Sequence, residues 1–168
     1  MPTKEYWDTC LFIAYLQNRE DEQDIVNVVD ALLRGAREKN ERLILISTMV
    51  LAEIRPRDIY DDFHWSVARD LFYTNRPYMK IQALTPRLAD LASSIGGDHN
   101  SLTPPDTVHV ATALSEQVDI FYTLDGKHEH GARRRSDLLE YDGKIGKPPL
   151  KIKVPTMPLS TQLRLNQP

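Results

Sequence analysis

The sequence predicts an α/β protein: a single domain with three layers, α/β/α, built on a central parallel sheet. Two observations carry this prediction. Short, continuously apolar runs such as 43–46 are typical of strands that are buried on both faces of a sheet. These runs alternate with stretches in which apolar residues recur every three to four positions, as they do in amphipathic helices. Strands that alternate with helices pair in parallel through right-handed crossovers.

The expected elements follow from these two patterns in chain order. The predicted strands are 4–7, 43–46, 78–84, 120–124 and 150–154. The predicted helices are a stretch after Asp8, then 25–36, 47–54, 61–74, 88–95 and 104–118, with a turn or two of helix in 133–141. Residues 1–154 are therefore expected to form the domain, and residues 155–168, which are rich in proline and polar side chains, a tail that is flexible or binds a partner.

Local residue types set the expected helix boundaries. Ser47 directly precedes an apolar helical stretch, and its hydroxyl suits an N-cap. Gly96 and Gly97 follow the stripe over 88–95, and glycine commonly ends a helix. Two prolines lead into the helix from 104, with Asp106 as a candidate N-cap.

Composition restricts the class of protein. The chain has 168 residues, of which 41% are apolar and 27% charged, so it can bury one substantial core. Its single cysteine excludes an intrachain disulfide and favours a reducing, cytoplasmic location. No uncharged apolar run approaches the roughly 20 residues that cross a bilayer, so no membrane association is expected. The net charge of −3 leaves nucleic-acid binding to local basic patches.

Four acidic residues lie at the ends of four apolar segments: Asp8, Glu53, Asp106 and Asp125. In a parallel sheet the carboxyl ends of the strands meet at one edge, so these carboxylates are expected to converge there. Four carboxylates in one cleft repel each other unless cations neutralise them. The sequence therefore predicts a metal site. Taken one at a time, Asp106 could merely cap its helix and Asp125 could be a turn residue.

The segments around these acids resemble, in order, the PIN-domain family of metal-dependent nucleases. The resemblance spans roughly residues 4–125 and is carried by "YWDTCLFIAYL", "ISTMVLAEI", "PPDTVHVATAL" and "FYTLD". It implies a PIN-like nuclease domain that hydrolyses RNA phosphodiester bonds. Asp8, Asp106 and Asp125 would then hold Mg²⁺ or Mn²⁺, and Glu53 would be a further ligand or would orient the attacking water.

Other side chains are candidates for supporting roles. Thr9 and Thr123 could orient a carboxylate or contact phosphate. The basic run Arg133, Arg134 and Arg135, together with His128, could hold the RNA backbone, although a solvated charge run fits equally well. His128 stands where family members often carry an aromatic residue. His109 and Cys10 are interpreted as packing residues, with a site contact for His109 left open.

Several functions remain open on the sequence. The family resemblance suggests the toxin of a bacterial toxin–antitoxin pair, which implies a cognate antitoxin as partner and a homodimer. The long segment after Asp125 departs from a minimal toxin. The alternatives are a DNA or structure-specific nuclease on the same site, and a non-catalytic module that kept the fold and binds nucleic acid or protein. Small-molecule nucleotide binding is disfavoured, because the sequence has neither a GxGxxG turn nor a Walker loop.

Overall fold

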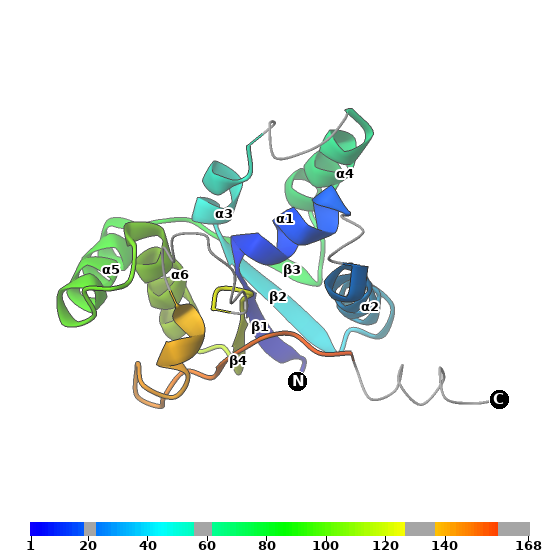
Figure 1. The fold of residues 1–168 in the computed structure, drawn as a ribbon. Coiled ribbons are helices and arrows are strands. Elements are labelled where there is room, and N and C mark those ends of the chain that lie inside the picture. The colour runs from blue at the N-terminus through cyan, green and yellow to red at the C-terminus, as the bar shows by residue number, and fades with distance from the viewer. Residues whose placement is uncertain (19–22, 56–61, 127–136, 158–168) are drawn as a thin grey trace.

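The predicted α/β fold is confirmed by the computed structural model, which describes residues 1–18, 23–55, 62–126 and 137–157 (Figure 1). The strands are β1 (Thr3–Trp7), β2 (Arg42–Ser47), β3 (Met79–Gln82), β4 (Ile120–Tyr122) and β5 (Ile152–Lys153). The helices are α1 (Thr9–Gln17), α2 (Gln23–Lys39), α3 (Thr48–Glu53), α4 (Asp62–Tyr73), α5 (Pro86–Asp98), α6 (Pro104–Ser115) and the 3₁₀ turn η3 (Leu138–Tyr141).

The five strands pair in parallel in the order β3-β2-β1-β4-β5. The first strand in the sequence is therefore central, with β2 on one side and β4 on the other. The carboxyl ends of these three strands lie next to one another at one edge of the sheet. This edge is where an open parallel sheet places its ligand site.

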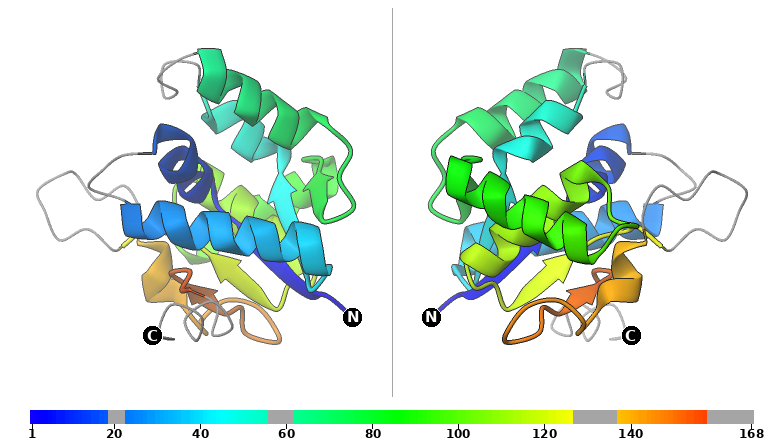
Figure 2. Two further views of the ribbon diagram at one scale, coloured as in Figure 1. Left: turned by 90° about the vertical axis from the view of Figure 1, so that its right-hand side faces the viewer. Right: turned by 90° about the vertical axis from the view of Figure 1, so that its left-hand side faces the viewer.

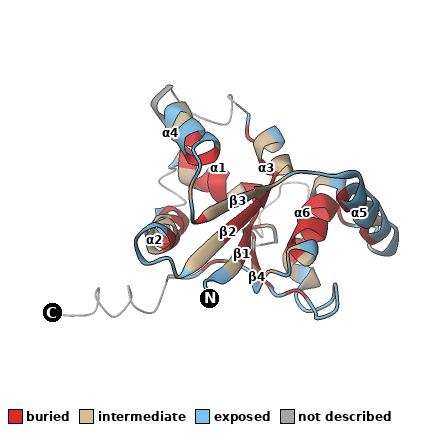
Figure 3. Ribbon diagram, turned by 180° about the vertical axis from the view of Figure 1, so that it is seen from behind, coloured by how far each residue is buried: buried red, intermediate tan, exposed pale blue. Residues whose placement is uncertain are grey.

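Helices cover both faces of the sheet and give the three layers (Figure 2). Side chains alternate between the two faces along each strand. Trp7 and Ile46 point to one face, where they pack with helices α1, α2, α3 and α4. Tyr6, Leu45 and Phe121 point to the other, where α5, α6 and η3 cover them. The buried residues accordingly form two apolar clusters, one on each side of the sheet (Figure 3).

Two expected helix boundaries were wrong. Helix α5 runs through Gly96 and Gly97 and ends at Asp98. A Cβ at position 96 would lie 3.5 Å from the Thr107 methyl carbon, so this glycine lies where α5 packs closely against α6. Helix α6 has Thr103 as its N-cap, not Asp106. The two prolines occupy its first positions, where a missing N–H costs nothing.

The last strand, β5, lies within the strand expected over 150–154 and extends the sheet beside β4. Beyond it, Pro155 is buried and Met157 packs against the cluster under α1, α2 and α4. Residues 158–168 of the expected tail lie outside the described residues, so the domain boundary at 154 stays a prediction. Among the described helices, none is long and apolar enough to cross a membrane.

Candidate functional site

The first candidate residue, Asp8, is held between β1 and α1. Its backbone N–H donates to the Tyr122 carbonyl (3.0 Å), which continues the β1–β4 pairing by one residue. Its extended backbone and side chain form the N-cap of α1, with Oδ1 accepting from Thr9 N (2.7 Å). Oδ2 accepts from the Thr123 hydroxyl (2.7 Å) and from the Cys10 thiol (3.3 Å). The carboxylate is buried and fixed by three donors, two from α1 and one from the residue after β4.

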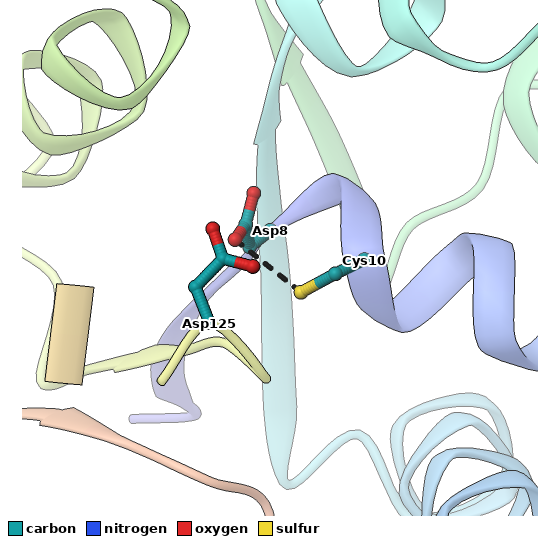
Figure 4. A group of neighbouring side chains, drawn as sticks. All are labelled: Asp8, Cys10 and Asp125. Carbon is teal, nitrogen blue, oxygen red and sulfur yellow. Dashed lines mark hydrogen bonds between the residues drawn. The ribbon is translucent and has the colours of Figure 1, made fainter. Parts of the chain in front are cut away.

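Asp8 and Asp125 are brought together, with Cys10 beside them (Figure 4). One ligand atom from each of these three side chains lies within 4.8 Å of the others, close enough to hold a metal ion. The Thr123 hydroxyl links the two acids, because it donates to the Asp8 carboxylate and accepts from Asp125 N (3.0 Å). Two carboxylates at this spacing suit a hard divalent cation, which prefers oxygen ligands and retains waters.

Cys10 is a site residue rather than only a packing residue, contrary to the sequence interpretation. Its sulfur accepts from Leu124 N (3.1 Å) and lies 3.6 Å from the Thr123 hydroxyl. Burial, followed by the negative charges of Asp8 and Asp125, raises the pKa of this thiol well above its ordinary value. The thiol therefore stays protonated and donates to Asp8. Its place two residues after the first acid was the only sequence signal for this role.

Glu53 lies at the carboxyl end of α3, and its carboxylate faces α1 and α6. Oε2 accepts from the Thr9 hydroxyl and from His109 Nε2, the latter at 2.9 Å. Burial raises the pKa of Glu53, but the hydrogen bonds from His109 and Thr9 outweigh it, and the pKa is lowered overall. Glu53 is therefore a carboxylate at neutral pH, and Thr9 joins it to Asp8 through its hydroxyl and its backbone N–H.

His109, left open by the sequence, lies in the interior of the site with 1% of its surface exposed. Its Nε2 is 2.9 Å from Glu53 Oε2 and 3.7 Å from Asp8 Oδ1, and its Nδ1 is 2.7 Å from the Tyr6 hydroxyl. Burial lowers the pKa of the imidazole, but the bond to Glu53 and the negative charges of Asp8 and Asp106 raise it above its ordinary value. The signal in the sequence was its position one helical turn after Asp106.

Asp106 is buried at the start of α6, in the third helical position. Its Oδ2 accepts from the backbone N–H of Thr103 (2.8 Å) and from the Thr103 hydroxyl, so it takes part in a capping box. Among the described residues, neither Asp106 nor Glu53 belongs to the group formed by Asp8, Cys10 and Asp125. The negative charge of Asp106 helps to raise the pKa of His109, whose Nε2 lies 3.7 Å from Asp8 Oδ1.

The expected phosphate-binding residues Arg133, Arg134, Arg135 and His128 lie outside the described residues. What the structure does place at the site is a connected set of polar side chains at the carboxyl ends of β1, β2 and β4. Two acids that are 117 positions apart in sequence, at 8 and 125, converge there.

Comparisons with known proteins agree with this geometry. The family model of the PIN domain matches residues 6–134, which is more than half of the chain, and the chain belongs to the PIN-domain family. Membership supports nuclease activity, that is, hydrolysis of phosphodiester bonds. PIN nucleases use divalent metals, and the group around Asp8 could hold one. No curated protein matches the sequence significantly.

Two solved structures show the same fold at low identity. VapBC2 from Rickettsia felis, bound to a DNA fragment from their promoter, aligns over 90% of this chain and 98% of the matched chain, at 13% identity and a TM-score of 0.56. VapC20 from Mycobacterium tuberculosis, a sarcin–ricin loop cleaving toxin, aligns over 73% of this chain and 90% of its own, at 13% identity and a TM-score of 0.55.

Proposed function

We propose that this chain is an endoribonuclease that depends on Mg²⁺ or Mn²⁺ and serves as the toxin of a toxin–antitoxin pair. The observation that carries the proposal is the convergence of Asp8 and Asp125 at the carboxyl ends of β1 and β4, with Thr123 bonded to both. These two acids would hold the cation, with Asp106 and Glu53 completing the acidic surroundings.

The chain's own residues prepare this site in two ways. Thr123 and Cys10 donate to Asp8 Oδ2 and so fix the direction of that carboxylate. Glu53 remains ionised and accepts hydrogen bonds through one oxygen, which suits a group that orients the attacking water. When bound, a divalent cation supplies charge neutralisation at the phosphate and lowers the pKa of a bound water.

The test is cleavage of a mixed RNA pool in Mn²⁺, with and without EDTA. We expect Asp8→Asn and Asp125→Asn to abolish cleavage while the circular dichroism spectrum stays unchanged, since each replaces a charged oxygen by an amide of the same shape. Asp90→Asn is the matched control, because Asp90 is an exposed acid on α5. Cleavage retained in Asp8→Asn would refute the assignment.

RNA specificity is tested by offering RNA, single-stranded DNA and flap substrates side by side. Cleavage of RNA alone supports the endoribonuclease. Equal or better cleavage of DNA would instead indicate a DNA or structure-specific nuclease that uses the same site. RNA binding that EDTA does not change, without cleavage of any substrate, would instead favour the non-catalytic module.

The toxin role is supported by the family resemblance and by VapC20, a toxin that cleaves the sarcin–ricin loop and shares this fold. Induced expression should arrest growth, and Asp125→Asn should relieve the arrest. Growth arrest that persists in the inactive variant would contradict an enzymatic toxin. A cognate antitoxin and a homodimer remain proposals, to be tested by co-expression with the neighbouring reading frame and by light scattering.

A further inference from the structure

A line of buried hydrogen bonds runs from β2 through β1 and α6 to Glu53. It begins at the backbone N–H of Ser47, which donates to the Tyr6 hydroxyl at 3.1 Å. That hydroxyl lies 2.7 Å from His109 Nδ1, and His109 Nε2 lies 2.9 Å from Glu53 Oε2. Tyr6 and Ser47 are 0% exposed and His109 is 1% exposed, so these three cannot exchange their partners for bulk water, whereas the Glu53 end of the line is part-buried.

When His109 is neutral, the donors in this line have one consistent direction. A backbone N–H can only donate, so the Tyr6 oxygen accepts from Ser47. At the other end of the line, the ionised Glu53 carboxylate can only accept, so His109 Nε2 carries the hydrogen between them. In the neutral ring Nδ1 then carries no hydrogen and accepts from the Tyr6 hydroxyl.

The opposite direction is disfavoured by the same geometry. If the neutral ring carried its hydrogen on Nδ1, the bare Nε2 would face a Glu53 carboxylate oxygen 2.9 Å away with no hydrogen between them. Two acceptors at this distance repel, and the buried imidazole nitrogen would be left without a donor, which is costly. His109 is therefore held with Nδ1 as the acceptor and with its hydrogen on Nε2, directed at Glu53.

Glu53 receives this hydrogen bond on the same oxygen that accepts from the Thr9 hydroxyl. Neither contact occupies Oε1. The carboxylate is thus fixed by donors from α1 and α6, although it sits on α3, a helix of only six residues. The same His109 nitrogen lies 3.7 Å from Asp8 Oδ1, so Glu53 and Asp8 are gathered around one imidazole.

We propose that His109 is a positioning residue for the proposed nuclease: Glu53 and Tyr6 together fix the neutral ring in its Nε2–H form, and this donor holds the Glu53 carboxylate beside Asp8 with Oε1 left for the reaction. The inference rests on the proposed function only where it assigns Glu53 Oε1 a part in RNA hydrolysis. The state of the ring and its bond to Glu53 do not depend on activity.

The activity-independent test is a long-range ¹H–¹⁵N spectrum of the imidazoles of the metal-free protein at alkaline pH, with the His109 signals assigned by their loss in His109→Gln. We expect a protonated Nε2 and an unprotonated Nδ1, with the Nε2 proton protected from exchange. In Tyr6→Phe, which removes the donor to Nδ1, we expect the Nδ1 resonance to shift while the hydrogen stays on Nε2, because Glu53 still accepts it. A hydrogen on Nδ1 in the wild type would overturn the proposal.

The activity test is a rescue series at position 109. Glutamine places an amide N–H near the position of Nε2 and can still donate to Glu53, whereas asparagine reaches only as far as Nδ1 and leucine donates nothing. We expect kcat in Mn²⁺ to fall by about 10- to 100-fold in His109→Leu and His109→Asn, with KM for RNA within twofold, and to be largely rescued in His109→Gln.

Each outcome of this series is informative. If His109→Leu keeps full kcat, or if His109→Gln is as slow as His109→Leu at equal thermal stability, the ring only fills space and the proposal fails. If the wild type cleaves nothing, the proposed function fails instead, and the imidazole spectra still decide whether Tyr6 and Glu53 fix His109.

Discussion

Removal of the Tyr6 hydroxyl provides the sharpest stability prediction, because the structure isolates its contribution. In Tyr6→Phe the ring remains, and with it the stacking on Phe121, whose centroid lies 4.9 Å away. Only the hydroxyl is lost. Two buried groups then lose their partner, namely the N–H of Ser47 and Nδ1 of His109.

The size of the effect follows from these two groups. Leaving one buried polar group unpaired costs about 1–3 kcal/mol, so two such groups predict a loss of about 2–6 kcal/mol in the free energy of unfolding. That is a large share of the roughly 5–15 kcal/mol that stabilises a typical domain.

The assay is urea unfolding followed by fluorescence in EDTA, so that metal binding does not contribute. Tyr141→Phe is the matched control: its hydroxyl bonds to Ser101, which is exposed, and water can replace that partner. We expect the control to stay within about 0.5–1 kcal/mol of the wild type. A loss below about 1 kcal/mol in Tyr6→Phe would show that the buried line of hydrogen bonds does not hold the site together.

Three further predictions concern other parts of the site and fold. In EDTA, the free energy of unfolding should fall as pH rises through the raised pKa of His109, because charged His109 is fully paired with Glu53 only below about pH 6.5. It should also fall as pH drops below 4.5 through the lowered pKa of Glu53, because the carboxylate is then protonated. Urea midpoints from pH 4 to 9 measure this, and an unchanged alkaline slope in His109→Gln would contradict it. Thr123→Val keeps the shape of the side chain but removes the hydroxyl that donates to Asp8, so calorimetry should show a Mn²⁺ affinity about 10- to 100-fold weaker. An unchanged affinity would show that this hydroxyl does not support the metal site. Gly146→Ala should lower the free energy of unfolding by about 1–3 kcal/mol, because φ is +88° and the new Cβ would lie 2.4 Å from a leucine methyl of α6. Gly143→Ala, also at positive φ but with open space around it, should lower it less. Equal losses in the two variants would show that the steric clash does not contribute.

Much of the fold could be predicted from local sequence. The continuous apolar run at 43–46 became β2, because a strand buried on both faces needs apolar side chains at successive positions. The short strand expected before Asp8 became β1, although it carries a buried Glu5. Ser47 was identified as an N-cap, and its hydroxyl does accept from Met49 N. The extent of α5 could not be predicted, because this helix packs along α6, and a local pattern does not record a contact between two helices.

The candidate site divides in the same way. The sequence by itself determined the candidate acids, their order and their expected edge of the sheet, because parallel strands carry their carboxyl ends to one edge. That β1 and β4 are neighbours, so that Asp8 and Asp125 meet, follows from the strand order. Only the tertiary structure decided which side chains hold them. Tyr6, Cys10 and His109 look like packing residues in the sequence, and they acquire polar roles because the strand order sets β1 between β2 and β4 and brings α6 against that centre. The partners in these hydrogen bonds are about 40 to 115 residues apart in the sequence, and no local pattern specifies which of them meet.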